Sequence, residues 1–148
     1  MFTHHVRTGT EIAATPDRVW AVLADLDAYP SWNPFVPAVL EGRAEAGSSL
    51  LFRIRPLGAI ASATVRARIA CVEPNVELAW EGELAGPLLT FRHGFRLVPL
   101  QGGQRTYLEH HERFEGLLSP TMAAAIPLLR RSYRRWDTAL CDRVEGGR

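Results

Sequence analysis

The chain has 148 residues, 47% of them hydrophobic, and a net charge near +1. This length and apolar content support one domain, spanning residues 1–148, with a substantial core. The small net charge gives no general attraction to nucleic acid or acidic membranes. The absence of lysine excludes a Schiff-base lysine and any lysine-dependent phosphate loop.

The chain shows no sign of export or membrane insertion. Its N-terminal residues alternate polar and apolar, without the apolar core of a signal peptide. No segment reaches about 18 apolar residues, so we expect no membrane span and, by default, a cytoplasmic location. Cys71 and Cys141 fit no zinc or CxxC spacing and are expected to be buried thiols rather than a disulfide.

The first elements are a strand and a short helix. Residues 2–12 alternate between two faces, which predicts a strand. Thr15 is placed to cap a helix, with Pro16 at its first position and Asp17 near the positive end of its dipole. The helix is expected to be short, because a proline follows soon after.

Residues 31–35 are expected to form a turn or one helical turn packed by aromatic side chains. Pro30 and Pro34 bracket Trp32, and neither proline continues a helix well. Two interpretations of this segment remain open. Trp32 and Asn33 lie at the mouth of a pocket, or Trp32 closes the fold and Asn33 caps a turn.

Six further strands follow, separated by short turns that contain Gly, Pro or Asn. Short turns predict antiparallel neighbours, and the consistent alternation predicts one solvated face and one covered face. The expected strands span residues 38–44, 49–55, 62–72, 76–84, 89–98 and 105–115.

The longest helical pattern runs from Ser119, a plausible N-cap, to about Glu145, and Gly146 and Gly147 end it. Pro127 lies inside the run and is expected to kink the helix. One face is apolar and should cover the sheet: Met122, Ile126, Leu129, Tyr133, Trp136, Leu140 and Val144. The other faces carry Arg130, Arg131, Arg134, Arg135, Asp137 and Arg143.

Three segments resemble a known family. They are residues 12–20 (IAATPDRVW), residues 26–34 (LDAYPSWNP), and residues 112–118 (ERFEGLL) before the long helix. In this order the chain resembles the START-like (SRPBCC) superfamily over its whole length, and within it the polyketide cyclase/dehydrase-like branch. That superfamily shares the helix-grip fold of the birch-pollen allergen, termed Bet v 1-like.

The resemblance implies an α+β helix-grip fold. A seven-stranded antiparallel sheet would curl around the long C-terminal helix, and two short helices after the first strand would close one end. Across the superfamily, the space between sheet and helix is a pocket for apolar or amphipathic small molecules, lipids included. Such a fold does not by itself specify an activity.

Three polar residues fall on strand faces that are otherwise apolar: His93, His110 and Glu112. The short turn at residues 101–104 makes their strands neighbours and places His93 nearest to Glu112 or His110. We consider three roles: a buried cluster that satisfies its own hydrogen bonds, a polar contact to a ligand, and acid/base catalysis. The spacing is not typical of a metal site, so we expect no metal and no cofactor.

The expected pocket wall combines strand residues with the apolar face of the helix, and the same residues also serve as core. The candidate ligand-binding residues are Trp32, Phe52, Val65, Trp80, Phe91, His93, His110, Met122, Ile126, Leu129 and Tyr133. The Tyr133 hydroxyl needs a hydrogen-bond partner if it is buried.

We favour binding of a small hydrophobic or aromatic molecule under the C-terminal helix. The second hypothesis is a cyclase or dehydrase acting on a polyketide-like substrate through His93, His110 and Glu112. The third is a protein- or ribosome-interaction module that uses the arginine cluster of the helix. No nucleic acid is expected as a partner, and the sequence leaves the oligomeric state open, a homodimer included.

Overall fold

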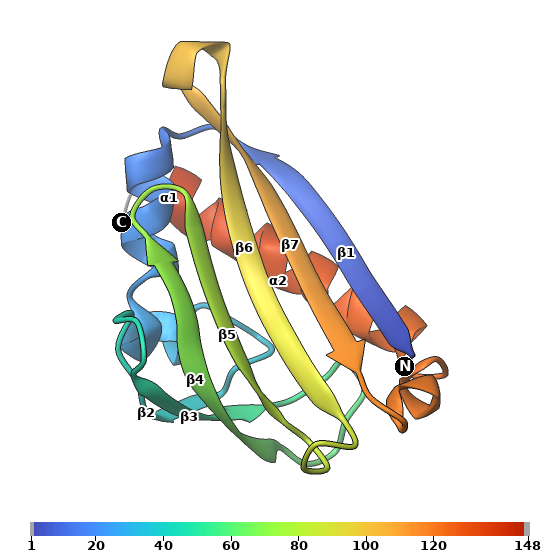
Figure 1. Ribbon diagram of the computed structural model, residues 1–148. Helices are drawn as coiled ribbons and strands as arrows, with labels where there is room; N and C mark the ends of the chain where they lie inside the picture. The colour runs from blue at the N-terminus through green and yellow to red at the C-terminus, as the bar shows by residue number, and fades with distance from the viewer. Residues whose placement is uncertain (1, 147–148) are drawn as a thin grey trace.

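The structure is a computed structural model and describes residues 2–146. Two helical elements follow the first strand, one joins the last two strands, and two more follow the last strand (Figure 1). The elements are β1 (Thr3–Ile12), α1 (Pro16–Leu23), η1 (Leu26–Ser31), β2 (Ala38–Glu41), β3 (Ser49–Ile54), β4 (Ala63–Glu73), β5 (Glu77–Glu83), β6 (Thr90–Leu100), η2 (Gln101–Gly103), β7 (Arg105–Glu115), η3 (Ser119–Met122) and α2 (Ile126–Glu145).

The seven strands form one antiparallel sheet in the order β1-β7-β6-β5-β4-β3-β2. Successive strands from β2 to β7 are neighbours because short turns join them, and β1 returns to pair with β7. The helix α2 lies along one face of this sheet, and α1 and η1 lie near one of its ends (Figure 1). The predicted helix-grip α+β fold is therefore confirmed.

Aromatic side chains close the end formed by α1 and η1. The Tyr29 hydroxyl donates a hydrogen bond to the Leu23 carbonyl oxygen at 2.6 Å, and its ring packs edge-on against Trp32 and Trp136. The Asn33 side-chain oxygen accepts a hydrogen bond from the Phe35 amide at 2.9 Å. Trp32 thus packs at the closed end, and Asn33 stabilises a turn.

The long helix begins later than the sequence pattern predicted. Residues Ser119–Met122 form the separate short element η3, and α2 starts at Ile126 with Pro127 in its first turn. Proline lacks an amide hydrogen and its ring would clash with the preceding turn, so a helix tolerates it only at its start. The predicted continuous helix and the predicted kink at Pro127 were therefore wrong.

Ser119 is buried rather than a helix cap. Its hydroxyl donates to the Phe2 carbonyl oxygen at 2.9 Å and lies 3.3 Å from His4 Nδ1, which ties the segment after β7 to the start of β1. At the other end α2 stops at Glu145, before Gly146. Gly147, which was also expected to end the helix, lies outside the described residues.

The two cysteines are free thiols, but they are half-buried rather than buried. Burial raises the pKa of Cys71. Burial and the nearby Glu145 carboxylate raise the pKa of Cys141 to about 12. Neither is therefore a reactive thiolate at neutral pH.

Candidate functional site

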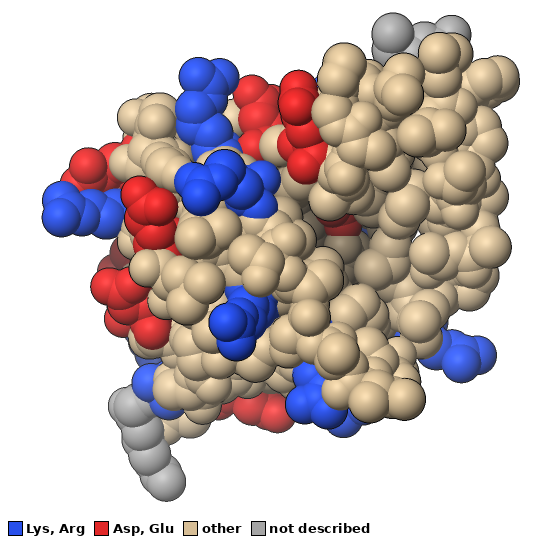
Figure 2. Space-filling view, turned by 90° about the horizontal axis from the view of Figure 1, so that it is seen from below, with Lys and Arg blue, Asp and Glu red and all other residues tan. Residues whose placement is uncertain are grey.

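A cavity of about 80 Å³ lies between the inner face of the sheet and α2. Seen from the end of the molecule that carries the β5–β6 turn, the surface is hollowed, and acidic atoms are visible inside the hollow (Figure 2). Of the residues that line the cavity, Glu112 alone is acidic. The lining is Phe35, Phe52, Ile54, Val65, Trp80, Leu84, Phe91, His93, Glu112, Phe114, Met122, Leu129, Tyr133 and Trp136.

The sequence predicted much of this wall. Eight of the candidate ligand-binding residues line the cavity: Phe52, Val65, Trp80, Phe91, His93, Met122, Leu129 and Tyr133. Trp32, His110 and Ile126 do not. Trp32 packs against Tyr29, His110 is fully buried behind His93, and Ile126 is the first residue of α2. Whether the other eight contact a ligand stays a prediction.

Part of the surface at this end of the molecule is uncharged (Figure 2). Three segments without a charged residue meet there: residues 56–65, 84–91 and 116–129. They expose large apolar side chains, among them Ile60 at 96% and Leu117 at 68%. An apolar molecule would therefore meet little charge around the hollow.

The polar part of the wall comes from β6, β7 and α2. His93 lies directly opposite Glu112 in the β6–β7 register, and its Nδ1 is 3.4 Å from Glu112 Oε2. The Tyr133 hydroxyl donates a hydrogen bond to the same carboxyl oxygen. Trp80, the cross-strand neighbour of His93 on β5, stacks on the imidazole at 5.0 Å and fixes the ring plane. Three polar side chains therefore converge in an otherwise apolar cavity.

A second, fully buried layer continues this cluster. His110 Nε2 lies 2.7 Å from His93 Nε2, and His110 Nδ1 lies 2.6 Å from Asp137 Oδ1. The other Asp137 oxygen accepts a hydrogen bond from the Thr8 hydroxyl at 2.6 Å. The result is one hydrogen-bonded chain from Thr8 on β1 to Glu112, which we term the polar chain.

Burial decides the protonation of His110. Its side chain is inaccessible to solvent, and desolvation lowers its pKa to about 4, although the hydrogen bond with Asp137 opposes this shift. At neutral pH the ring carries one proton. The Asp137 carboxylate accepts hydrogen bonds only, so we assign that proton to His110 Nδ1.

The direction of the remaining hydrogen bonds follows from this assignment. His110 Nε2 carries no proton, so it accepts a hydrogen bond from His93 Nε2. His93 Nδ1 then faces the Glu112 carboxyl group at 3.4 Å. The polar chain therefore presents an imidazole nitrogen and a carboxyl group to the cavity.

Asp137 was expected on a helix face other than the apolar one, and this expectation was wrong. Its side chain is only 2% exposed because α2 turns it toward His110 and Thr8. The spacing in the sequence places Asp137 on the apolar face, because it lies four residues after Tyr133 and three before Leu140. An acidic residue on such a face indicates a buried partner.

Trp136 was predicted to face the sheet, and it also lines the cavity. The side chain is fully buried, and its indole N–H has no hydrogen-bond partner among residues 2–146. A buried donor without an acceptor costs about 1–3 kcal/mol, so such groups are rare unless a ligand or water completes them. The indole N–H is thus available to an acceptor in the cavity.

Other predicted features lie apart from the cavity. Within the part of the chain that the structure describes, no three His, Cys, Asp or Glu side chains are placed to hold a metal ion. Arg131, Arg134 and Arg135 are exposed and Arg130 is half-buried, so the arginine cluster faces away from the core. Residues 2–146 also contain no helix with the length and apolar character needed to cross a bilayer.

Comparison of the fold with solved structures places the chain among helix-grip proteins. The START superfamily protein from Mycobacterium smegmatis superimposes with a TM-score of 0.79 at 22% identity, over 98% of this chain and 99% of that chain. The Zhui aromatase/cyclase from Streptomyces sp. R1128 gives 0.75 at 19% identity, over 97% and 94%. Ara h 8.0201 gives 0.73 at 12% identity, over 98% and 99%. These identities establish a shared fold only.

The fold is thus shared with a START superfamily protein and with Ara h 8.0201. The chain belongs to the family described as polyketide cyclase/dehydrase and lipid transport, whose model matches residues 3–145. The resemblance seen in the sequence is thereby confirmed. No curated protein sequence matches the chain.

Proposed function

We propose that this protein binds a small, largely apolar or aromatic molecule between its sheet and α2, and that the molecule carries a carbonyl or hydroxyl group. The observation that carries the proposal is the convergence of His93, Glu112 and Tyr133 on an apolar cavity. Apolar walls with a few placed polar groups are typical of small-molecule sites. The lipid transport named in the family's description supports the same class of ligand.

The unpartnered N–H of Trp136 favours a ligand with a hydrogen-bond acceptor. A carbonyl oxygen would satisfy this donor and restore the hydrogen bond that the free protein lacks. The cavity of about 80 Å³ is smaller than the ~300–1,000 Å³ of most ligand sites. Side chains must therefore move when a ligand binds.

Native mass spectrometry of the purified protein tests the proposal directly, because a co-purifying small molecule would identify the ligand class. Fluorescence titration with phenylnaphthylamine, an uncharged aromatic probe, gives a second measurement. Leu129→Trp fills the cavity and should abolish binding, whereas Leu128→Trp, on the exposed side of the same turn, should not. Equal binding by both variants would reject the cavity as the site.

The polar chain favours a second candidate, acid/base catalysis of an aldol-type cyclisation and dehydration. The Glu112 carboxylate would remove a proton from a carbon beside a carbonyl, and the resulting enolate would attack a second carbonyl of the same molecule. A proton on His93 would go to the new alkoxide oxygen and give a hydroxyl. His93 would then remove the second proton from the same carbon, while the proton that Glu112 took in the first step goes to the hydroxyl, which leaves as water. Asp137 and His110 would hold His93 in position from behind.

A short poly-β-ketone thioester tests this second candidate. The wild-type protein should convert it to a ring product that has lost one water, detected by mass spectrometry. Glu112→Gln should retain binding of the thioester and lose turnover. Binding without turnover by the wild-type protein would reject catalysis and leave binding as the function.

A further inference from the structure

The end of the molecule that carries the β5–β6 turn exposes a group of apolar side chains. Residues 2–146 expose nine large hydrophobic side chains, and six of these lie in the uncharged segments 56–65, 84–91 and 116–129. All six are aliphatic, and clusters of this kind mark interaction surfaces. We term them the apolar tip: Ile60, Leu84, Leu88, Leu117, Leu118 and Leu128.

The segments that form the apolar tip meet at one end of the sheet. The Leu118 amide donates a hydrogen bond to the Leu88 carbonyl oxygen at 2.9 Å, which joins the segment after β7 to the β5–β6 turn. Gly116 permits this approach, because a Cβ there would collide with the same oxygen. The β3–β4 loop, which carries Ile60, lies at the same end (Figure 1). The fold therefore presents the apolar tip to a single partner.

The apolar tip continues into the wall of the inner cavity. Leu84 is 45% exposed and also lines the cavity. Met122, which lies in the segment 116–129, lines it as well. A partner in contact with the apolar tip is therefore next to the cavity.

A pocket of about 320 Å³ lies between the β3–β4 loop and α2. Arg55 and Arg135 line it, and no acidic residue does. Neither arginine forms an ion pair within the part of the chain that the structure describes. Arg55 Nε donates to the Ala59 carbonyl oxygen at 3.3 Å, which leaves its terminal nitrogens for another acceptor. Guanidinium groups in this state suit phosphate, which they bind through paired hydrogen bonds.

The loop wall of this pocket is attached to α2. The Leu57 amide donates to the hydroxyl of Ser132 at 2.9 Å, and that buried hydroxyl donates to the Leu128 carbonyl oxygen at 3.0 Å. The Arg55 amide donates to the Phe35 carbonyl oxygen at 2.8 Å. The loop and the helix that carry the two arginines are thus the same two elements that carry Ile60 and Leu128 of the apolar tip.

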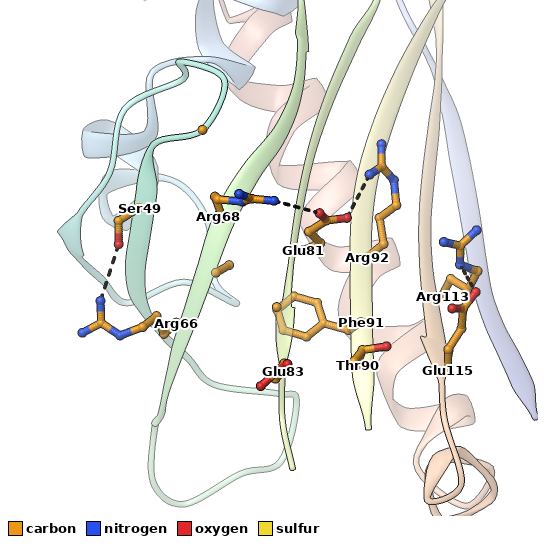
Figure 3. Close-up of a pocket in the computed structure, with 13 residues that line it drawn as sticks. Ser49, Arg66, Arg68, Glu81, Glu83, Thr90, Phe91, Arg92, Arg113 and Glu115 are labelled. Carbon is orange, nitrogen blue, oxygen red and sulfur yellow. Dashed lines mark hydrogen bonds and ion pairs between the residues drawn. The ribbon is translucent and has the colours of Figure 1, made fainter. Parts of the chain in front are cut away.

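The outer face of the sheet offers no comparable surface. Its groove of about 670 Å³ is lined by four arginines and three glutamates (Figure 3). Glu81 contacts Arg68 at 3.7 Å and Arg92 at 3.1 Å, and Arg113 pairs with Glu115 at 2.7 Å. Most of these charges neutralise one another. The pocket beside α2 differs, because its cations have no carboxylate near them.

We propose that the apolar tip docks on the surface of a lipid bilayer, and that Arg55 and Arg135 bind the phosphate of an anionic lipid headgroup. A bilayer accounts for both features, because aliphatic side chains enter its acyl region while arginines contact its headgroups. Protein partners typically contact surfaces rich in Tyr and Trp, which the apolar tip lacks. Docking goes beyond the proposed function, whereas exchange of a ligand between bilayer and cavity would rest on it.

Sedimentation with vesicles tests the apolar contact. Phosphatidylcholine vesicles with about 30% phosphatidylglycerol should bind the wild-type protein, and phosphatidylcholine alone should bind it about tenfold more weakly. Ile60→Asp combined with Leu117→Asp should weaken binding to the anionic vesicles by about tenfold or more. Leu40→Asp, at an exposed leucine of β2 outside the apolar tip, is the control and should bind normally. If circular dichroism shows an unfolded double variant, serine replaces aspartate.

The headgroup contact is tested by removing both cations of the pocket. Arg55→Gln combined with Arg135→Gln should weaken binding to the anionic vesicles by about tenfold or more and leave binding to phosphatidylcholine unchanged. Arg43→Gln combined with Arg143→Gln removes two exposed arginines outside the pocket and is the charge-matched control. An equal loss in this control would overturn the headgroup pocket.

The remaining outcomes separate docking from the proposed function. Failure of the wild-type protein to bind either kind of vesicle would overturn docking, as would binding that the substitutions in the apolar tip leave unchanged. Binding to polyglutamate instead of vesicles would assign the arginines to an acidic protein and also overturn it. None of the substituted residues lines the inner cavity. Titration with phenylnaphthylamine, without vesicles, therefore measures the proposed function independently.

Discussion

The Nε2 atoms of His93 and His110 lie 2.7 Å apart, so one imidazole must donate the hydrogen bond that the other accepts. Asp137, at the far nitrogen of His110, decides which ring donates. Asp137 accepts a hydrogen bond from the only N–H group of His110. The opposite nitrogen of His110 therefore carries no proton and accepts a hydrogen bond from His93. One buried carboxylate on α2 thus orients a histidine on β6 that it does not touch.

The first prediction concerns pH. Burial lowers the pKa of His110 from 6.5 to about 4, so between these values the unfolded state binds more protons than the folded state. The contribution of the neutral His110 side chain to the free energy of unfolding is therefore complete above about pH 6.5. It is lost as pH falls through about 4. Its loss should reduce the free energy of unfolding by about 3 kcal/mol. Urea denaturation near neutral pH and at about pH 4.5 measures most of this change.

The control is His110→Asn, which should remove that part of the pH dependence. His111 titrates in the same direction, because burial also lowers its pKa, but it is only half-buried. His111→Asn should therefore leave the larger part of the pH dependence in place. A slope that persists in His110→Asn would show that His110 is not the main titrating group.

The second prediction concerns Asp137. Asp137→Asn keeps the shape of the side chain, but it replaces a carboxylate that accepts from Thr8 and His110. It should lower the free energy of unfolding by about 2–3 kcal/mol, and Thr8→Val by about 1 kcal/mol. Denaturation of both variants and of the double variant gives their coupling.

The same substitution should reverse the polar chain. An asparagine amide donates to His110 Nδ1, so His110 would carry its proton on Nε2 and donate to His93. NMR of the imidazole nitrogens should therefore show exchanged tautomers in both rings. Unchanged tautomers in Asp137→Asn would contradict the assignment of donors and acceptors.

Local sequence rules predicted the strand half of the site. Alternation placed His93 and Glu112 on inward faces, and the turn at residues 101–104 fixed their register. Each rule uses residues close in the chain or joined by one tight turn. For that reason His93 could be placed nearest to Glu112 or His110 from the sequence, and the observed register selects Glu112.

The helix half of the site could not be predicted in the same way. The rotation of α2 against the sheet depends on packing over its whole length, and this decides that Asp137 meets His110. The end of the β4–β5 ladder at Arg68 and Glu81 is likewise invisible in the alternation, because unpaired and paired residues follow the same period. Contacts that depend on how distant elements pack therefore had to come from the structure.

The third prediction concerns Pro127. Because it lies in the first turn of α2, no helical hydrogen bond is lost there. Pro127→Ala should change the free energy of unfolding by less than about 1 kcal/mol. Pro127 would act as a hinge only inside a continuous helix. A change in probe-binding rate in Pro127→Ala, without a change in stability, would therefore argue for such a role.

The last prediction concerns the Trp136 indole, whose N–H has no acceptor within the described residues 2–146. Fluorenone and fluorene share a ring system, but only fluorenone has a carbonyl oxygen. The wild-type protein should bind fluorenone more tightly, by about fivefold to tenfold for one hydrogen bond. Trp136→Phe also loses packing, which affects both compounds alike, so the ratio of their Kd values isolates the N–H contribution. That ratio should fall toward one in Trp136→Phe. An unchanged ratio would assign the carbonyl contact to Tyr133 or His93 instead.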